Sequence, residues 1–235
     1  MDIILHDNER IDDLEFNGLK IIQSSNGFCF GIDAVLLSDF AKDIRNNSVV
    51  SDLCSGTGII SILLSGKTLA KKIYAVEIQE EAARLARTAV EANGFSDRIE
   101  VILGDAGNPK ALFRNQSLDL VACNPPYQAA GTGPQGAEES RSTARHELRF
   151  SLEQLAGTAR FALRFGGRLC LCLRPEQQRK DRPPSLFLLE CRSGGKTGLA
   201  VEPVLLLEQD GGGYSEALEK IYGDYRANAG WKNRS

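Results

Sequence analysis

Short apolar runs alternate with longer amphipathic segments through the middle of the chain. The short runs predict buried strands, and the segments between them carry apolar residues at helical spacing. Strands are expected at 49–54, 72–77, 99–103, 118–123 and 168–173. Helices are expected at 59–64, 80–93 and 152–165. Strands that alternate with helices form right-handed βαβ units, so the pattern predicts an α/β fold with a doubly wound, mostly parallel sheet.

The two ends of the chain follow a different pattern. Apolar pieces at 14–16 and 19–23 flank Asn17-Gly18, which is a strong signal for a two-residue β-hairpin. Asp33 then precedes an amphipathic stretch and is expected to be a helix N-cap.

Near the C-terminus, the apolar runs 185–191 and 201–207 predict an antiparallel hairpin at the sheet edge. A last helix is expected at 214–222, starting at Ser215. We therefore expect a hairpin and helix in 1–47, packed on a main domain at 48–225, and a flexible tail at 226–235.

Composition is that of an ordinary globular protein. The 235 residues are 42% hydrophobic and 25% charged. No apolar run approaches the roughly 20 residues that span a bilayer. The N-terminal residues lack the basic start and long apolar segment of a signal peptide. We expect a cytoplasmic protein with no membrane partner.

Charge and cysteine content limit the ligands that the protein is expected to bind. The net charge is −3, so the overall surface charge does not favour binding of nucleic acid. Arg141, Arg145 and Arg149 are spaced by four and could form a local basic face, or they could be scattered solvated arginines. The six cysteines form no C-x-x-C pair and there are two histidines, which predicts reduced thiols and no metal site.

Three predicted strands end in residues that suit a nucleoside. Asp52 begins a strand–turn–helix passage that contains Gly56 and Gly58, and glycines let a ligand approach the backbone. Glu77 ends the next strand, where a carboxylate can accept from ribose hydroxyls, and Asp105 follows the third. A dinucleotide reductase prefers a third glycine at the position of Ser61, so that class is disfavoured.

The tetrapeptide Asn124-Pro125-Pro126-Tyr127 follows the fourth predicted strand. The prolines have no N–H to donate and stop the strand, which leaves Asn124 and Tyr127 at its carboxyl end. There they could hold a flat polar molecule such as a nucleobase. Taken alone, the same residues also fit a Pro-Pro turn with a surface tyrosine.

The passage Asp52-Leu53-Cys54-Ser55-Gly56-Thr57-Gly58 resembles motif I of class I S-adenosylmethionine-dependent methyltransferases. The tetrapeptide resembles motif IV of those that alkylate adenine N6, cytosine N4 or a glutamine side chain. The resemblance implies S-adenosylmethionine as cofactor. It implies that Asn124, Pro125, Pro126 and Tyr127 are catalytic, with the first two accepting the amine hydrogens and Tyr127 stacking on the ring. The cofactor residues it implies are Asp52, Cys54, Gly56, Gly58, Glu77, Ile78, Gly104, Asp105, Ala106 and Asn124.

The segments 16–23 and 27–37 resemble the start of the tRNA adenine-N6 methyltransferase family. That family modifies the adenine next to the anticodon of a valine tRNA, at position 37. Residues 144–147 and 192–196 also match it. The implied partner is therefore tRNA. The protein itself is expected to be a monomer or a homodimer. Adenine in ribosomal RNA or DNA, or a release-factor glutamine, are the alternative substrates, and a non-catalytic binding module is the alternative class.

One stretch departs from this family. After Arg174 such proteins usually have a helix and a sixth strand before the edge hairpin, and residues 177–184 leave no room for them. Either the fold lacks a piece, or residues are missing from the sequence.

Overall fold

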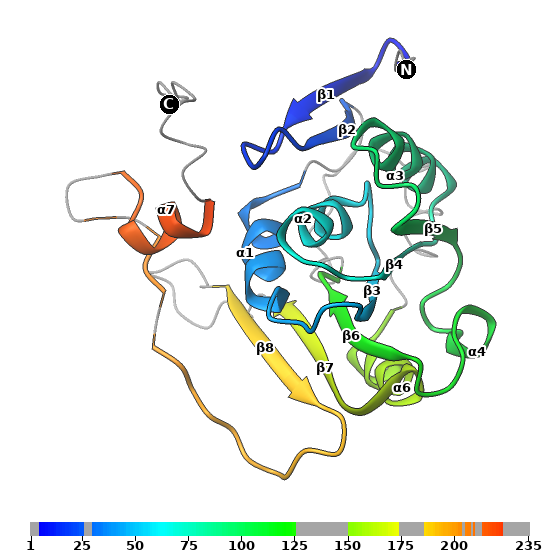
Figure 1. Ribbon diagram of the computed structural model, residues 1–235, viewed down its shortest axis with the longest axis vertical. Coiled ribbons are helices and arrows are strands. Elements are labelled where there is room, and N and C mark those ends of the chain that lie inside the picture. The colour runs from blue at the N-terminus through cyan, green and yellow to red at the C-terminus, as the bar shows by residue number, and fades with distance from the viewer. Residues whose placement is uncertain are drawn as a thin grey trace, which may run out of the picture.

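The computed structural model describes residues 5–25, 30–125, 150–173, 186–203, 205–207, 209 and 213–222. Within these ranges the chain forms the helices and strands that Figure 1 shows. In chain order they are β1 (Glu9–Asp13), β2 (Lys20–Ser24), α1 (Ile32–Ala41), β3 (Val49–Leu53), α2 (Ile59–Lys67), β4 (Lys72–Glu77), α3 (Glu80–Ala92), β5 (Ile99–Leu103), α4 (Pro109–Leu112), β6 (Leu118–Cys123), α6 (Leu152–Ala162), β7 (Leu163–Leu173), β8 (Phe187–Arg192) and α7 (Glu216–Tyr222).

The central sheet has the strand order β5-β4-β3-β6-β7-β8. The first five of these strands are parallel, and β8 pairs antiparallel with β7. The chain runs outward from β3 through β4 to β5, then returns to place β6 on the other side of β3. This reversal is a topological switch point, the place where open α/β sheets bind ligands. The predicted fold class is confirmed.

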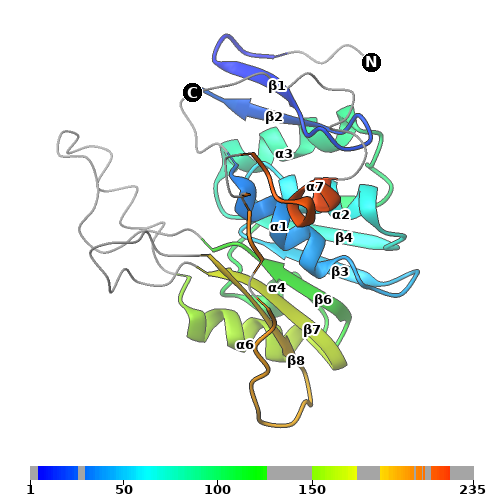
Figure 2. The same cartoon turned by 90° about the vertical axis from the view of Figure 1, so that its left-hand side faces the viewer.

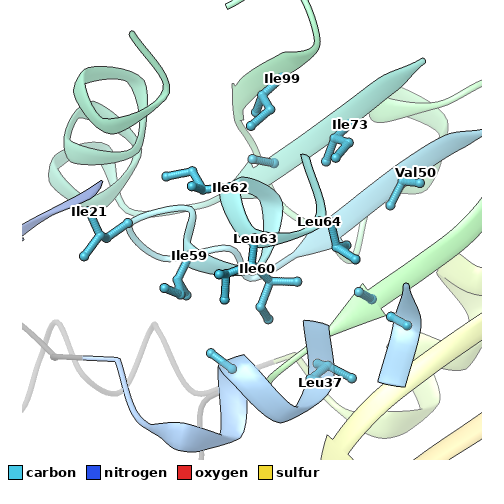
Figure 3. Packing of buried hydrophobic residues seen from close by; sticks show 14 of the residues in the cluster. Ile21, Leu37, Val50, Ile59, Ile60, Ile62, Leu63, Leu64, Ile73 and Ile99 are labelled. Atoms are coloured by element: carbon cyan, nitrogen blue, oxygen red, sulfur yellow. The ribbon is translucent and has the colours of Figure 1, made fainter. Parts of the chain in front are cut away.

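Helices cover both faces of the sheet, because side chains on a strand alternate between the two faces. On one face Val50, Ile73 and Leu120 pack against α1, α2 and α3, and Figure 3 shows α2 at the centre of this cluster. On the other face the strands pack against α6. Burying one such Leu, Ile or Val side chain stabilises the fold by about 1.5–3 kcal/mol.

The N-terminal hairpin forms, but its turn differs from the prediction. β1 and β2 pair with Asp13 opposite Lys20, so the loop spans 14–19 rather than Asn17-Gly18 alone. Leu14 and Leu19 are buried, and the close approach of Phe16 and Leu19 to Gly66 places this loop on α2. Packing of these side chains outweighs the local turn signal. The hairpin lies beside α3 (Figure 2), and Glu9 of β1 forms an ion pair with Arg84 of α3.

The prediction of Asp33 as an N-cap is wrong. Helix α1 begins at Ile32 with Gly31 as N-cap and no side-chain capping bond. Asp33 therefore lies inside the first helical turn, where its carboxylate is available to another part of the chain.

The predicted C-terminal hairpin is also wrong. β8 pairs with β7 over Phe187–Arg192, and the described part of 201–207 forms no strand. β8 pairs antiparallel along the edge of β7 that the parallel strands leave open. Pro203 lacks an N–H and interrupts the second apolar run. The expected antiparallel edge strand is thus present with a different partner.

Smaller differences occur at other element ends. The predicted helix 152–165 ends at Ala162, and β7 begins at Leu163, opposite Leu118, with a bulge before Arg168. The last helix starts at Glu216, and Ser215 Oγ accepts a hydrogen bond from the Leu218 N–H at 3.1 Å. Arg141, Arg145 and Arg149 lie outside the described residues.

The described residues include neither a membrane-spanning helix nor a cluster of metal ligands. None of the helices described is long and apolar enough to cross a membrane. The same residues contain no group of three or more His, Cys, Asp or Glu side chains that could hold a metal ion.

Candidate active site

The predicted site residues meet at the carboxyl ends of β3, β4, β5 and β6. Leu53 of β3 is the direct neighbour of Cys123 of β6 in the sheet register. The turn that begins at Cys54 and the corner that begins at Asn124 therefore leave the sheet side by side, at the switch point. The fold brings the glycine turn and the start of the tetrapeptide into one place, as the sequence predicts.

Asp52 is a buried carboxylate held by the start of α2. Its side chain is fully buried, and its Oδ2 accepts from the backbone N–H of Ser61 at 3.1 Å and from Ser61 Oγ at 2.8 Å. Oδ1 has no hydrogen-bond partner among the described residues. Burial raises the pKa of Asp52 to about 7, with the nearby charge of Glu77 acting the same way and the Ser61 bonds acting against it.

The turn from Cys54 to Gly58 is compact because several of its residues have left-handed backbone angles. Cys54, Gly56 and Gly58 have φ of 58°, 54° and 86°. At Gly58 a Cβ atom would also lie 3.3 Å from the Cβ of Ala86 in α3. The glycines thus let the turn be tight and admit α2 close to α3. The Cys54 thiol hydrogen-bonds to buried Cys123 and, with burial, raises the pKa of Cys123, which stays protonated.

Glu77 connects this turn to the end of β4. It is 5% exposed, and its Oε2 accepts from the Gly56 N–H at 2.8 Å. Its Oε1 accepts from the N–H groups of Ile78 and Gln79, each at 2.9 Å. A carboxylate has about four acceptor positions, so three bonds leave one position on Oε2 for a ligand hydroxyl.

The end of β5 contributes a more open group. Asp105 is exposed, and its Oδ1 accepts from the Gly107 N–H at 2.7 Å. Ala106 is buried, and its carbonyl accepts from Thr158 Oγ1 at 2.8 Å. Gly104 lies close under α4, where a Cβ would be 2.9 Å from Leu112 Cδ2. Ile78 is 56% exposed at the neighbouring strand end, so an apolar surface is open beside these polar groups.

Asn124 forms the other side of the switch point. Its Nδ2 donates to Asp33 Oδ2 at 3.1 Å, which joins β6 to the first turn of α1. Its Oδ1 is buried and has no hydrogen-bond partner among the described residues. Pro125 follows and is partly buried. Pro126 and Tyr127 lie outside the described residues.

The sequence does not identify two of the site residues. In the sequence Ser61 is only a departure from a glycine pattern, yet it donates twice to Asp52. The sequence predicts a helix cap at Asp33, yet this residue binds Asn124. A serine early in the helix after the turn is a usable signal for the first residue. No local pattern identifies the second, because its partner is distant in the chain.

These residues suit a cationic nucleoside ligand. A buried carboxylate with an unpartnered oxygen favours a positive charge nearby, because ionisation in a dry site is costly without one. The free position on Glu77 suits a ribose hydroxyl, and the exposed Ile78 suits a flat base. Across the switch point, the unpartnered Asn124 Oδ1 is an acceptor that lacks a donor. Together they can hold a charged nucleoside on one side and an amine on the other.

The fold is that of class I methyltransferases, and solved structures show the same fold. A "predicted O-methyltransferase" of Agrobacterium tumefaciens superposes with a TM-score of 0.64 at 21% identity, covering 83% of this chain and 96% of that one. The TYW2 protein of P. horikoshii, solved in complex with MeSAdo, gives a TM-score of 0.51 at 14% identity, covering 75% of this chain and 57% of that one.

Sequence comparison specifies the family. Residues 19–182 match the methyltransferase small domain. A Porphyromonas gingivalis relative named tRNA1(Val) (adenine(37)-N6)-methyltransferase is 32% identical over 72% of this chain and 68% of its own length. A Shewanella halifaxensis relative of the same name is 30% identical over 68% of this chain and 64% of its own. The chain belongs to the methyltransferase small domain family and, within it, to the family of these tRNA adenine-N6 methyltransferases, which confirms the resemblance inferred from its motifs.

Proposed function

We propose that this protein methylates the N6 amine of an adenine in tRNA, with S-adenosylmethionine as methyl donor. The observation that carries the proposal is the position of Asn124. It leaves β6 next to the glycine turn of β3, with a buried Oδ1 that lacks a donor among the described residues. An acceptor of this kind suits an amine that enters from outside.

The cofactor side uses the carboxylates and the turn. When bound, S-adenosylmethionine supplies an electrophilic methyl group on a positively charged sulfur. Asp52 places negative charge beside the turn, and Gly56 and Gly58 keep the backbone accessible. Glu77 accepts from the ribose with its remaining position on Oε2. Asp105 accepts from the adenine amine, and Ile78 lies against the adenine ring.

The target side raises the reactivity of a poor nucleophile. The lone pair of an adenine amine is delocalised into the ring. When Asn124 Oδ1 and the Pro125 carbonyl both accept its hydrogens, the nitrogen becomes more tetrahedral and its lone pair is directed at the methyl group. Tyr127 stacks on the ring. The rate gain comes from positioning and from stabilising positive charge that develops on the nitrogen. An adenine within folded RNA leaves its stack to enter such a site.

The substrate assignment rests on relatives. Both relatives described above are named for adenine 37 of tRNA1(Val), and we propose the same nucleotide for this chain. We propose a cytoplasmic location, which a tRNA substrate supports. We also propose that residues 1–47 act with the methyltransferase domain at 48–225, which the ion pair between Glu9 and Arg84 supports.

Methyl transfer from labelled cofactor to four candidate substrates tests the proposal. The substrates are total tRNA from a strain that lacks the gene, ribosomal RNA, duplex DNA and a peptide release factor. We expect label in tRNA only. Label in the release factor or DNA, or in none of the four, would contradict the assignment.

A further inference from the structure

Asn124 is useful to an incoming amine only in one of its two amide orientations. The Oδ1 and Nδ2 atoms have nearly the same shape, so packing alone does not select between them. With Oδ1 toward the amine, the side chain accepts a hydrogen. After a half-turn of the amide, an NH₂ group would face the amine, and two donors would oppose each other.

The partner of Nδ2 makes this selection. Asp33 Oδ2 lies 3.1 Å from Asn124 Nδ2, and an ionised carboxylate accepts hydrogen bonds but cannot donate them. A flipped amide would place Oδ1 against the carboxylate, so two acceptors would repel each other in a site where Asp33 is 2% exposed. The orientation that remains turns Oδ1 away from α1.

Two features of the preceding segment fix the position of Asp33: a glycine that leaves room for its carboxylate, and hydrogen bonds to the N-terminal hairpin. At Gly31 a Cβ atom would lie 2.6 Å from Asp33 Oδ1, so a glycine is what allows the carboxylate to turn back over the helix start. Just before it, the Phe30 N–H donates to Gln23 Oε1 at 3.1 Å, and Gln23 is also hydrogen-bonded to Asp12 of β1. The N-terminal hairpin therefore fixes the segment that carries Asp33.

We propose that Asp33 is a positioning residue, which holds the Asn124 amide so that Oδ1 faces the target amine. This rests on the proposed function for the direction in which Oδ1 acts. Asp33 does not contact the reacting atoms. It acts through Asn124, and its negative charge strengthens the hydrogen bond that Oδ1 accepts, because successive hydrogen bonds polarise one another.

Asp33→Asn is the main test, because it keeps the shape and lets the side chain donate as well as accept. We expect kcat for tRNA methylation to fall on the order of 10²-fold, as misplacement of a reacting group does. The cofactor Kd and the KM for tRNA should stay within about twofold, because neither depends on the amide orientation. Asp43→Asn, at an exposed position just beyond α1, is the matched control and should behave as wild type. A kcat for Asp33→Asn within about twofold of wild type, at equal melting temperature, overturns the proposal.

Two further variants separate positioning from a loss of folding. Gly31→Ala displaces Asp33 without removing it and should lower kcat in the same way. Gly157→Ala in α6, where a Cβ meets nothing within 4 Å, should not. In an Asn124→Ala background, Asp33→Asn should change the residual rate by less than about twofold, since its effect passes through Asn124. If the two substitutions instead lowered kcat by independent factors that multiply in the double variant, Asp33 would not act through Asn124.

A measurement without substrate distinguishes failure of this proposal from failure of the proposed function. In protein with nitrogen-15-labelled asparagine, the Asn124 side-chain amide resonance is the one that Asn124→Ala removes. Asp33→Asn should move it, and Asp43→Asn should not. If the wild type methylates no tRNA, the proposed function fails and this resonance alone decides the role of Asp33. An unmoved resonance overturns it.

Discussion

The two sides of the switch point are assembled in different ways. On the cofactor side, Asp52 binds Ser61 nine residues later in the chain, and Glu77 binds its own two following N–H groups and that of Gly56. On the target side, Asn124 binds Asp33, which is 91 residues away in the sequence. The cofactor side is formed by β3, the turn that follows it and the end of β4. The target side also requires α1, which precedes the strands of the central sheet in the chain.

This difference predicts which substitutions affect cofactor binding and which affect the rate of methyl transfer. Substitutions in the turn should weaken cofactor binding without altering the target side. Changes at Asn124 or in the N-terminal segment should slow transfer and leave cofactor binding intact.

Asn124→Ala should give the largest effect. Loss of the acceptor should lower kcat by about 10²- to 10³-fold, the range seen when one preorganised transition-state hydrogen bond is removed. Cofactor affinity, measured by calorimetry, should change little. Equal activity in this variant would contradict the mechanism, and equal loss of cofactor binding would contradict the separation of the two sides.

Glu77→Ala should weaken cofactor binding on the order of 10²-fold, because hydrogen bonds to a charged group contribute about 1.5–3 kcal/mol. The same change frees three N–H groups and should also lower the melting temperature. Glu80→Ala, at an exposed position in the first turn of α3, is the matched control. A cofactor Kd that is equal in both variants would remove Glu77 from the site.

The pH dependence of stability should report on Asp52. Because its folded-state pKa of about 7 lies above the ordinary value of 3.8, the folded protein retains a proton that the unfolded chain has lost between these values. The free energy of unfolding should therefore fall as pH rises through that window, by up to about 1.4 kcal/mol per pH unit, and level off above it. Asp52→Asn should remove this component. Identical profiles for both proteins, without cofactor, would show that Asp52 is ionised throughout.

Ser61→Ala should have the smallest of these effects. It removes one hydrogen bond to Asp52 and should lower the free energy of unfolding by about 1–3 kcal/mol at pH 8, where Asp52 is ionised, and by less at pH 5. Ser65→Ala is the matched control on the same helix, since Ser65 Oγ is buried and has no hydrogen-bond partner among the described residues. Chemical denaturation at both pH values measures the difference. A larger loss for Ser65→Ala would mean that the Ser61 bond contributes little.

The contrast between the two sides also marks how far the sequence was predictive. The predicted strands 72–77, 99–103 and 118–123 match β4, β5 and β6 to the residue. Their short apolar runs are buried in the sheet, and local turn residues mark their ends. Asp52, the glycine turn and Glu77 were found because their arrangement is nearly local. Their roles as cofactor residues stay a prediction.

The failures share a physical cause. The hairpin loop at 14–19 is set by the burial of Leu14 and Leu19, and β8 is placed by the open edge of β7. The roles of Ser61 and Asp33 depend on which carboxylate or amide lies opposite each of them. Except for Ser61, whose partner Asp52 lies only nine residues away, a partner remote in sequence outweighs the local signal, and a single sequence does not show that partner.

Nucleoside mass spectrometry of unmodified valine tRNA, after incubation with the protein and deuterated-methyl cofactor, would show whether adenine 37 receives the methyl group. A second tRNA with guanine in place of adenine 37 is the control. We expect labelled N6-methyladenosine at position 37 of the first tRNA and none in the second. Label at another nucleotide, label in both tRNAs, or no label with cofactor bound would contradict it.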